Sequence, residues 1–266
     1  MKAEFIFQKL WLQYSSENPS AGKIHNLFQD LGEQVVNDHV AFRTFNDPRV
    51  DIEVISRPFL DAGYVPKGDY VFEAKKLKAK HYELPGHPEA PRVFISELLL
   101  EAFTDYLQET IRQGLDSVSP DVLSSPELIF QGRIFSPVSH EVYEKLRQES
   151  EYAAWLYVYG YRANHFTVSI NYLKNFNGIE AVNSFLKKQG FELNSSGGEI
   201  KGNPAQLLEQ SSTLADRVEV DFSDGRHVIP SCYYEFARRY EDSQGSLFNG
   251  FVAGSADKIF ESTDYR

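Results

Sequence analysis

The feature that most constrains this fold is one order of predicted elements that occurs twice along the chain. In residues 38–100 the apolar pattern predicts a strand, a helix and then three strands, and residues 164–236 repeat that order. Each copy opens on an acid or an amide followed by a histidine, as in Asp38-His39 and Asn164-His165. The copies share little sequence, so the repeat is inferred from the pattern of elements. We therefore predict two βαβββ modules.

The other segments predict helices around these modules. The predicted parts are N-terminal helices in 1–37, the first module in 38–100, a helical insert in 101–160, the second module in 161–240 and a C-terminal segment in 241–266. A chain of 266 residues with 42% hydrophobic residues can bury a sizeable core. We therefore expect a single compact domain of the α+β class. The three closing strands of the second module are expected at 199–201, 217–222 and 227–234.

Composition narrows the classes of partner. The chain has 27 Lys and Arg against 38 Asp and Glu, a net charge of −11, which argues against nucleic acid as a partner. Its one cysteine, Cys232, can form neither an internal disulfide nor a thiolate metal site, and we expect it to be a small buried side chain. No apolar run approaches the ~18 residues of a membrane span, and the first residues lack a signal-peptide pattern. These features favour a cytoplasmic protein.

Polar and apolar side chains alternate along the strand predicted at 165–172. One face carries four polar side chains, and the other carries apolar ones; the polar row is His165, Thr167, Ser169 and Asn171. A strand with one face in water explains such alternation. The alternative is a curved sheet whose polar concave side lines a ligand cavity while helices cover the apolar side.

In the first copy, His39 and Arg43 share one face of the strand that begins the module. Together they match a metal ligand beside an anion clamp, because guanidinium binds a carboxylate in a bidentate fork. A histidine at the edge of the core beside a surface arginine is the alternative.

Glu235 lies among aromatic residues at the end of the last predicted strand of the second copy. A carboxylate there is costly unless it is paired or bound to a metal. A salt bridge to Arg238 or Arg239 would explain it. Taken with His39 and His165, it instead completes two imidazoles and one carboxylate, which is the ligand preference of non-haem Fe(II) oxygenases.

The number of ligands is open at this point. Glu97 is the expected counterpart of Glu235 in the first copy, and His81 opens a strand there and could face the same cavity. Four protein ligands would leave less room for a chelating substrate and dioxygen, and would favour Lewis-acid chemistry.

Several segments together resemble one known family, from about residue 30 to the C-terminus. They are Asp38–Thr44, Asn164–Thr167, Gln210–Ala215, Ile229-Pro230 with Tyr234–Ala237, and Ser255–Thr263. The chain is similar here to the 2-oxoadipate dioxygenase/decarboxylase family, also called 2-hydroxyglutarate synthase. That resemblance implies a vicinal-oxygen-chelate fold, in which paired βαβββ modules form a half-barrel or barrel.

The resemblance also implies site residues. His39, His165 and Glu235 would ligate Fe(II), Arg43 would hold a substrate carboxylate, and Ser255 would lie near the substrate. Thr167, Ser169 and Asn171 would add hydrogen bonds to the ligands or to the substrate. The better-known members carry a long insertion between the glutamate ligand and the Ser-Ala-Asp-Lys segment, where this chain has a short connection.

The implied reaction converts a 2-oxo diacid such as 2-oxoadipate, with O2, to a 2-hydroxy acid (2-hydroxyglutarate) and CO2. Two other functions remain open. One is a glyoxalase-like metal lyase or isomerase on the same fold, with Glu97 as a fourth ligand and no need for oxygen. The other is a small-molecule-binding module without catalysis, since one architecture hosts many activities.

Overall fold

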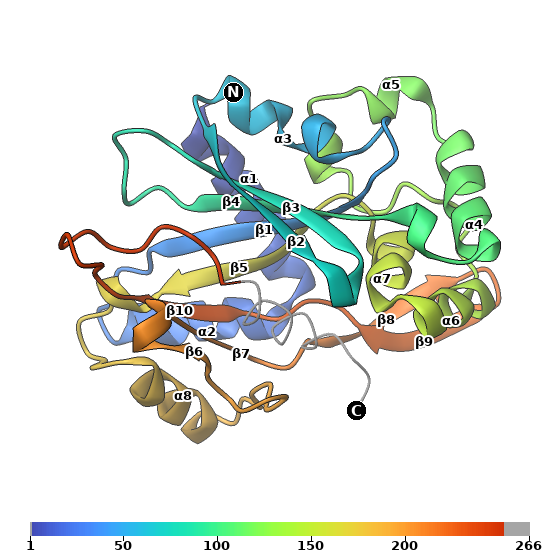
Figure 1. The fold of residues 1–266 in the computed structure, drawn as a ribbon. Coiled ribbons are helices and arrows are strands. Elements are labelled where there is room, and N and C mark those ends of the chain that lie inside the picture. The colour runs from blue at the N-terminus through green and yellow to red at the C-terminus, as the bar shows by residue number, and fades with distance from the viewer. Residues whose placement is uncertain (1, 253–266) are drawn as a thin grey trace.

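Eight strands form one curled sheet in which the two predicted modules stand side by side (Figure 1). The computed structural model describes residues 2–252. The first half of the sheet has the order β2 (Val65–Phe72), β3 (Leu77–Glu83), β4 (Arg92–Leu98) and β1 (Asn37–Phe45). The second half continues with β5 (Ala163–Ser169), β10 (Glu235–Arg239), β7 (Leu208–Ser212) and β6 (Lys201–Asn203). Each half holds one βαβββ unit, which confirms the predicted repeat.

The two modules join where β1 runs antiparallel to β5, a junction that we call the seam. Across it His39 pairs with Thr167 and Ala41 pairs with His165. Within each half the first strand lies parallel to the last, β1 to β4 and β5 to β10. The two histidines are therefore diagonal neighbours on one face of the sheet.

Helices cover the other face of the sheet. The helices that contact it are α1 (Ala3–Glu17), α3 (Ile52–Asp61) and α8 (Ile179–Lys188), and α2 (Pro19–Asp30) packs on α1. The ring of Trp11 lies 5.2 Å from that of Phe166, and Phe59 lies 5.4 Å from Phe42. Because side chains alternate along a strand, His39 and His165 point to the opposite, concave side.

The segment between the modules is helical, as predicted. It holds α4 (Asp105–Asp116), α5 (Pro120–Leu123), α6 (His140–Glu149) and α7 (Glu151–Tyr159). Ser150 caps α7 by accepting a hydrogen bond from the Ala153 amide at 3.1 Å. Almost all of α7 is buried, and it contacts β1. This helix therefore closes one end of the concave side.

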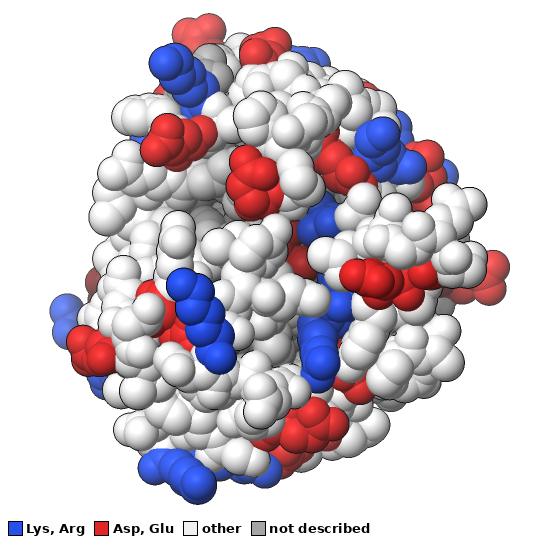
Figure 2. Space-filling model, turned by 90° about the vertical axis from the view of Figure 1, so that its left-hand side faces the viewer, with Lys and Arg blue, Asp and Glu red and all other residues white. Residues whose placement is uncertain are grey.

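Short 3₁₀ turns link the main elements; they are η1 (Glu73–Lys75), η2 (Leu100–Ala102), η3 (Leu128–Phe130), η4 (Ile170–Tyr172) and η5 (Pro204–Gln206). Within residues 2–252, none of the helices combines the length and apolar character needed to cross a bilayer. On the face in Figure 2, acidic and basic side chains are interspersed, and some of the basic ones lie in a furrow near its centre.

The prediction of the closing strands of the second module was wrong in part. The segments expected there form β8 (Arg217–Phe222) and β9 (Gly225–Pro230), which pair only with each other in a separate hairpin. The strands that complete the module are β7 and β10. β7 has the sequence Leu-Glu-Gln-Ser-Ser and is buried throughout, so it lacks the alternation that reveals a strand.

The prediction for Asn171 was also wrong. β5 ends at Ser169 and the chain turns into η4, so Asn171 leaves the polar row and is exposed. Its side chain instead pairs with the backbone of Arg239, accepting at 2.9 Å and donating at 2.8 Å. Asn171 therefore helps to hold the end of β10 in place.

Candidate metal centre

Three buried side chains meet on the concave side of the seam. His39 Nε2 lies 3.4 Å from His165 Nε2, and Glu235 places one carboxylate oxygen 3.6 Å from His39 Nε2 and the other 3.2 Å from His165 Nε2. Within residues 2–252 this is the one group of three or more His, Cys, Asp and Glu side chains with atoms close enough to share an ion. The structure therefore brings together the three residues predicted as ligands.

Three neighbouring strands carry these side chains at one level of the sheet. His39 comes from β1, His165 from β5 and Glu235 from the first position of β10. Thr167 pairs with His39 on one side and with Glu235 on the other. The group thus depends on strand register rather than on any short motif.

The two imidazole rings are oriented by the residue that precedes each of them. Nδ1 of His39 lies 2.9 Å from Oδ1 of Asp38, and Nδ1 of His165 lies 3.0 Å from Oδ1 of Asn164. Both oxygens accept hydrogen bonds, so each ring carries its proton on Nδ1. The lone pairs on both Nε2 atoms then face the centre of the group, as metal-binding histidines require.

Burial sets the charge of the group. It lowers the pKa of both histidines, so the rings are neutral at neutral pH. It raises the pKa of Glu235 to about 8, although Gln210 donates a hydrogen bond to that carboxylate at 2.6 Å. The other oxygen of Glu235 has no hydrogen-bond partner within the described part of the chain.

This donor set fits a divalent transition metal. Two neutral imidazole lone pairs converge with a buried carboxyl group that no Lys or Arg among residues 2–252 pairs with, so ionising this group is costly unless an ion binds. Imidazole and carboxylate ligands suit Fe(II), and three of them leave positions open. The residues present therefore fit the Fe(II) that the family resemblance implies.

Asp38 forms a buried ion pair with Arg239. Burial alone would raise the pKa of Asp38, but Arg239 and the hydrogen bond from His39 outweigh it and hold that pKa well below its usual value. Arg239 also donates to the carbonyls of Phe248 and Gly250, at 2.9 and 2.7 Å. The next residue, Phe251, places its ring 4.9 Å from that of His39. The C-terminal segment is thereby attached beside the ligands.

The salt bridge considered for Glu235 is not formed. Arg239 pairs with Asp38, and Arg238 donates to the Asn177 carbonyl at 3.2 Å and lies over the ring of Tyr240. Because Glu235 has neither arginine as its ion-pair partner, its burial needs another explanation, which a bound cation would give.

Arg43 lies four residues beyond His39 on the same face of β1. It is almost fully buried and pairs with Glu151 at 3.0 Å. Its guanidinium lies 4.9 Å from the ring centre of Tyr152 and 5.3 Å from that of Trp155. The structure therefore holds a buried cation inside the concave side, as an anion clamp requires.

The polar row of β5 lies along this group. Thr167 places its hydroxyl 3.1 Å from Nε2 of His39, within hydrogen-bond distance. Ser169 is buried two residues further along the same face and pairs with Ala237 of β10. Ser255 lies outside the described residues.

Glu97 does not join the group. Its carboxylate accepts a hydrogen bond from the Ile52 amide at 3.2 Å, at the start of α3 on the opposite face of the sheet. The register gives the reason: Glu235 pairs with Thr167, and the matching residue of β1, Ala41, pairs with Phe94. The counterpart of Glu235 in the first module is therefore Phe94, and the predicted symmetry between Glu97 and Glu235 was wrong.

His81 is buried on β3 but is separate from the three ligands. Its ring nitrogens lie 2.8 Å from the hydroxyl of Tyr70 and 3.0 Å from Glu83. Its ring centre lies 5.4 Å from that of Phe251, which also contacts His39. His81 thus belongs to the packing around Phe251.

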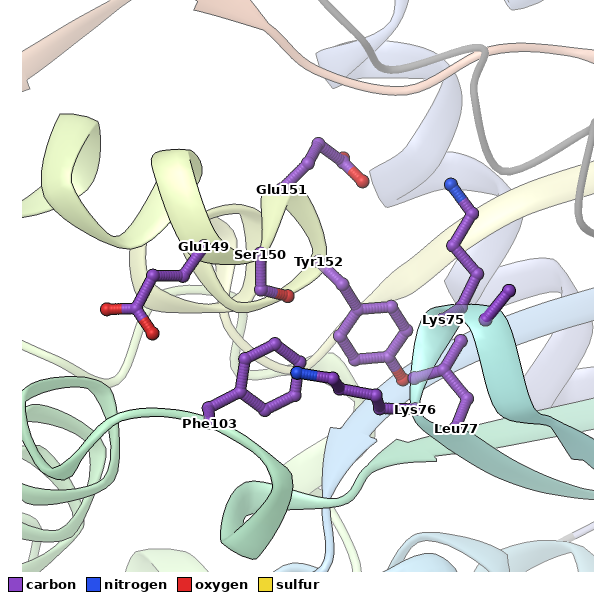
Figure 3. Close-up of a pocket in the computed structure, with 9 residues that line it drawn as sticks. Lys75, Lys76, Leu77, Phe103, Glu149, Ser150, Glu151 and Tyr152 are labelled. Carbon is purple, nitrogen blue, oxygen red and sulfur yellow. The ribbon is translucent and has the colours of Figure 1, made fainter.

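A cavity of about 380 Å³ opens near the buried arginine. Figure 3 shows Lys75 and Lys76, from the turn between β2 and β3, across from Glu151 and Tyr152 at the start of α7. The metal ligands do not line this cavity. Two of its lining residues, Glu151 and Tyr152, contact Arg43.

Some residues of the site were not predicted. In the sequence, Asp38 stands out only as part of a repeated dipeptide and Gln210 only as part of a family segment, although each hydrogen-bonds a ligand. Glu151 gave no signal at all, because its partner Arg43 is 108 residues away. Placement beside a histidine was the one sign that could have indicated Asp38 as an orienting residue.

The comparisons with known proteins agree with this geometry. The family model for 2-oxoadipate dioxygenase/decarboxylase matches residues 6–129 and 127–246. The Arabidopsis thaliana protein named 2-oxoadipate dioxygenase/decarboxylase, chloroplastic, is 38% identical over 94% of this chain and 74% of its own length. Because that name applies to the plant protein, the cytoplasmic location of this chain stays a prediction.

Solved structures with similar sequences have the same fold. Rice hydroxyglutarate synthase, solved in complex with 2-oxoadipate, is 35% identical with a TM-score of 0.88 and covers 97% of this chain and 91% of its own. A Shewanella frigidimarina protein provisionally described as a hydrolase is 52% identical with a TM-score of 0.90, over 95% of this chain and 98% of its own.

A more distant structure supports the fold class. A Ralstonia eutropha protein assigned to the glyoxalase superfamily has a TM-score of 0.76 at 21% identity, over 92% of this chain and 84% of its own. This likeness confirms the predicted α+β fold of vicinal-oxygen-chelate type. From the family model and these relatives together, the chain belongs to the 2-oxoadipate dioxygenase/decarboxylase family.

Proposed function

We propose that this protein is an Fe(II)-dependent dioxygenase that decarboxylates 2-oxoadipate, with O2, to 2-hydroxyglutarate and CO2. The observation that carries this proposal is the buried group of His39, His165 and Glu235. Three protein ligands suit a metal that must also hold a chelating substrate and dioxygen. The Arabidopsis and rice relatives are named 2-oxoadipate dioxygenase/decarboxylase, which supports the same reaction.

When bound, Fe(II) would supply the point at which a 2-oxo acid chelates and the electrons with which dioxygen reacts. The residues of the chain hold the rest of the site. Asp38 and Asn164 keep the proton of each imidazole on Nδ1. Gln210 fixes one oxygen of Glu235. These contacts set the directions of the three ligands before an ion arrives.

Arg43 would bind the carboxylate at the far end of the substrate. It is buried, it lies on the face of the ligands, and its fork of donors matches a carboxylate. In the absence of substrate, Glu151 provides a carboxylate to this guanidinium. A substrate carboxylate would displace Glu151 from Arg43 or bind Arg43 beside it. We therefore expect a diacid to bind better than a monoacid. The role of Ser255 at the substrate stays a prediction of the resemblance.

The decisive experiment loads the protein with Fe(II) under nitrogen and then adds O2 and 2-oxoadipate. We expect O2 uptake, CO2 release and 2-hydroxyglutarate formation in equal amounts. A panel of 2-oxo diacids of different lengths then identifies the preferred substrate. No turnover across the panel, with iron measured at one per chain, would contradict the proposal. Turnover under nitrogen would instead support the lyase or isomerase alternative.

A further inference from the structure

Tyr233 is a buried aromatic residue that lies directly against the candidate ligands. It is 1% exposed, and its ring stacks on that of His165 with 4.7 Å between the ring centres and 27° between the planes. It also precedes Glu235 by two residues.

The hydroxyl of Tyr233 has no hydrogen-bond partner within residues 2–252. A tyrosine hydroxyl is protonated at neutral pH and can donate one hydrogen bond. Leaving a buried donor unpaired is costly. Such a group in a native site therefore calls for an acceptor that is not part of the described chain.

Strand register shows where this side chain lies. β10 runs parallel to β5 with Glu235 opposite Thr167, so Tyr233, two residues before Glu235, is level with His165, on whose ring it stacks. Across the seam His165 pairs with Ala41, and Arg43 lies two residues further along the same face of β1. Tyr233 therefore lies on the Arg43 side of the ligand group.

The neighbouring Tyr234 provides an internal comparison. It is equally buried, and its hydroxyl also lacks a partner within the described chain. Its ring, however, lies 5.7 Å from Trp11 of α1 and 5.5 Å from Phe236, on the side covered by helices. Of these two adjacent phenols, only Tyr233 is placed against the ligands.

We propose that Tyr233 is a substrate-binding residue that donates a hydrogen bond to the same distal carboxylate that Arg43 binds, and thereby favours a 2-oxo diacid over a 2-oxo monoacid. This inference rests on the proposed function. A carboxylate accepts several hydrogen bonds at once, so it can take the guanidinium fork and the phenol together. An uncharged end of a substrate would give the buried phenol of Tyr233 no acceptor, which is the stronger source of discrimination.

The test compares Tyr233→Phe with Tyr234→Phe in the Fe(II)-loaded protein. Each change removes one buried hydroxyl and keeps the ring. The substrates are 2-oxoadipate and 2-oxohexanoate, which have equal chain length but differ in the distal carboxylate. We expect Tyr233→Phe to lower kcat/KM for 2-oxoadipate about tenfold and to change that for 2-oxohexanoate less than about twofold. Tyr234→Phe should leave both values, and their ratio, unchanged.

An equal loss with both acids, or no loss with either, would overturn the inference, because the phenol would then not act on the distal carboxylate. Iron content is measured for each variant, so that a loss of metal is not mistaken for a loss of substrate binding.

Failure of the proposed reaction gives a different result. If the wild-type protein consumes no O2 with 2-oxoadipate, the two acids are titrated calorimetrically into the Fe(II) protein under nitrogen. Binding of 2-oxoadipate that is about tenfold weaker in Tyr233→Phe, with 2-oxohexanoate unaffected, supports the inference even so. Equal binding to wild type and variant, or no binding to the wild type, overturns it.

Discussion

Arg239 on β10 donates two hydrogen bonds to Asp38 on β1, at 2.7 and 2.9 Å, and both side chains are buried. The same carboxylate accepts the Nδ1 proton of His39. The ring of one candidate ligand is therefore oriented by an ion pair that reaches across β5, from the first module to the last strand of the second. The two bonds of Arg239 to the Phe248 and Gly250 carbonyls join the C-terminal segment to the same pair.

Replacing Arg239 with Met should damage both stability and metal binding. The change removes the closer of the two arginines that pair with the buried Asp38 and leaves only Arg92, at 3.6 Å, so it should cost at most about 3–5 kcal/mol. It also frees the ring of His39 to turn, so Fe(II) affinity should fall about 10–100-fold. Urea unfolding of the metal-free protein and a competition titration with a chelator measure the two effects.

Arg238→Met is the matched control, because Arg238 has the same charge and neighbours Arg239 but contacts no ligand. We expect its metal affinity to equal that of the wild type. Wild-type metal affinity in Arg239→Met would show that the ion pair does not orient His39.

Glu235→Gln should abolish metal binding while preserving the fold. The amide keeps the volume of the side chain and an oxygen that can accept the hydrogen bond of Gln210. A divalent ion at about 1,000 times its dissociation constant should add about 4 kcal/mol to the free energy of unfolding of the wild type. The variant should show no such gain. Thermal unfolding under nitrogen, with and without Fe(II) and after a chelator, measures both; an equal gain in the variant would place the ion elsewhere.

Glu97→Gln should leave metal binding intact and stabilise the protein at neutral pH. Burial raises the pKa of Glu97, so its ionised form is disfavoured in the folded state. That cost is present above the usual pKa of a glutamate and disappears as the pH falls below it. We therefore expect Tm of the variant to exceed that of the wild type at pH 7 and to equal it near pH 4.

The size of this effect is limited, because Glu97 is only half-buried. About 1 kcal/mol or less corresponds to a shift in Tm of at most about 2–4 °C in a chain of this size. Melting curves between pH 4 and pH 8, with iron measured in parallel, check both points. Loss of the metal in this variant would restore the hypothesis of a fourth ligand.

Glu151→Gln should strengthen substrate binding. Glu151 pairs with the guanidinium of Arg43, where we expect the distal carboxylate of the substrate to bind. Removing the competing charge should lower KM for 2-oxoadipate about three- to tenfold with little change in kcat. Glu149→Gln is the control, because Glu149 is exposed and lines the same cavity (Figure 3). A raised KM in Glu151→Gln, measured by O2 uptake, would mean that Glu151 helps Arg43 to bind substrate.

The ligand group could be predicted because local patterns placed each ligand. Alternation along β1 and β5 put His39 and His165 on the faces away from the apolar side chains, and the repeat implied that the two strands would be equivalent. Glu235 was identified because a carboxylate among aromatic residues is costly. These arguments needed no knowledge of which strands pair.

The partner of each ligand could not be predicted in this way. The hairpin of β8 and β9 has a clearer alternating pattern than β7, so the pattern predicts its strands as part of the module. The pattern likewise predicts Glu97 as the counterpart of Glu235, whereas the strand register gives Phe94. Tyr233 and Gln210 acquire their roles only from neighbours distant in sequence. Register and hydrogen-bond partners are tertiary properties, and no single-segment pattern contains them.

Metal binding at the seam requires both halves of the sheet. One ligand comes from the first half of the sheet and two come from the second, so a fragment that contains either half alone lacks a complete set. A protein cut within the helical connector would have to reassemble both pieces before it could take up an ion. Metal uptake thus reports that the whole duplicated sheet has been put together correctly.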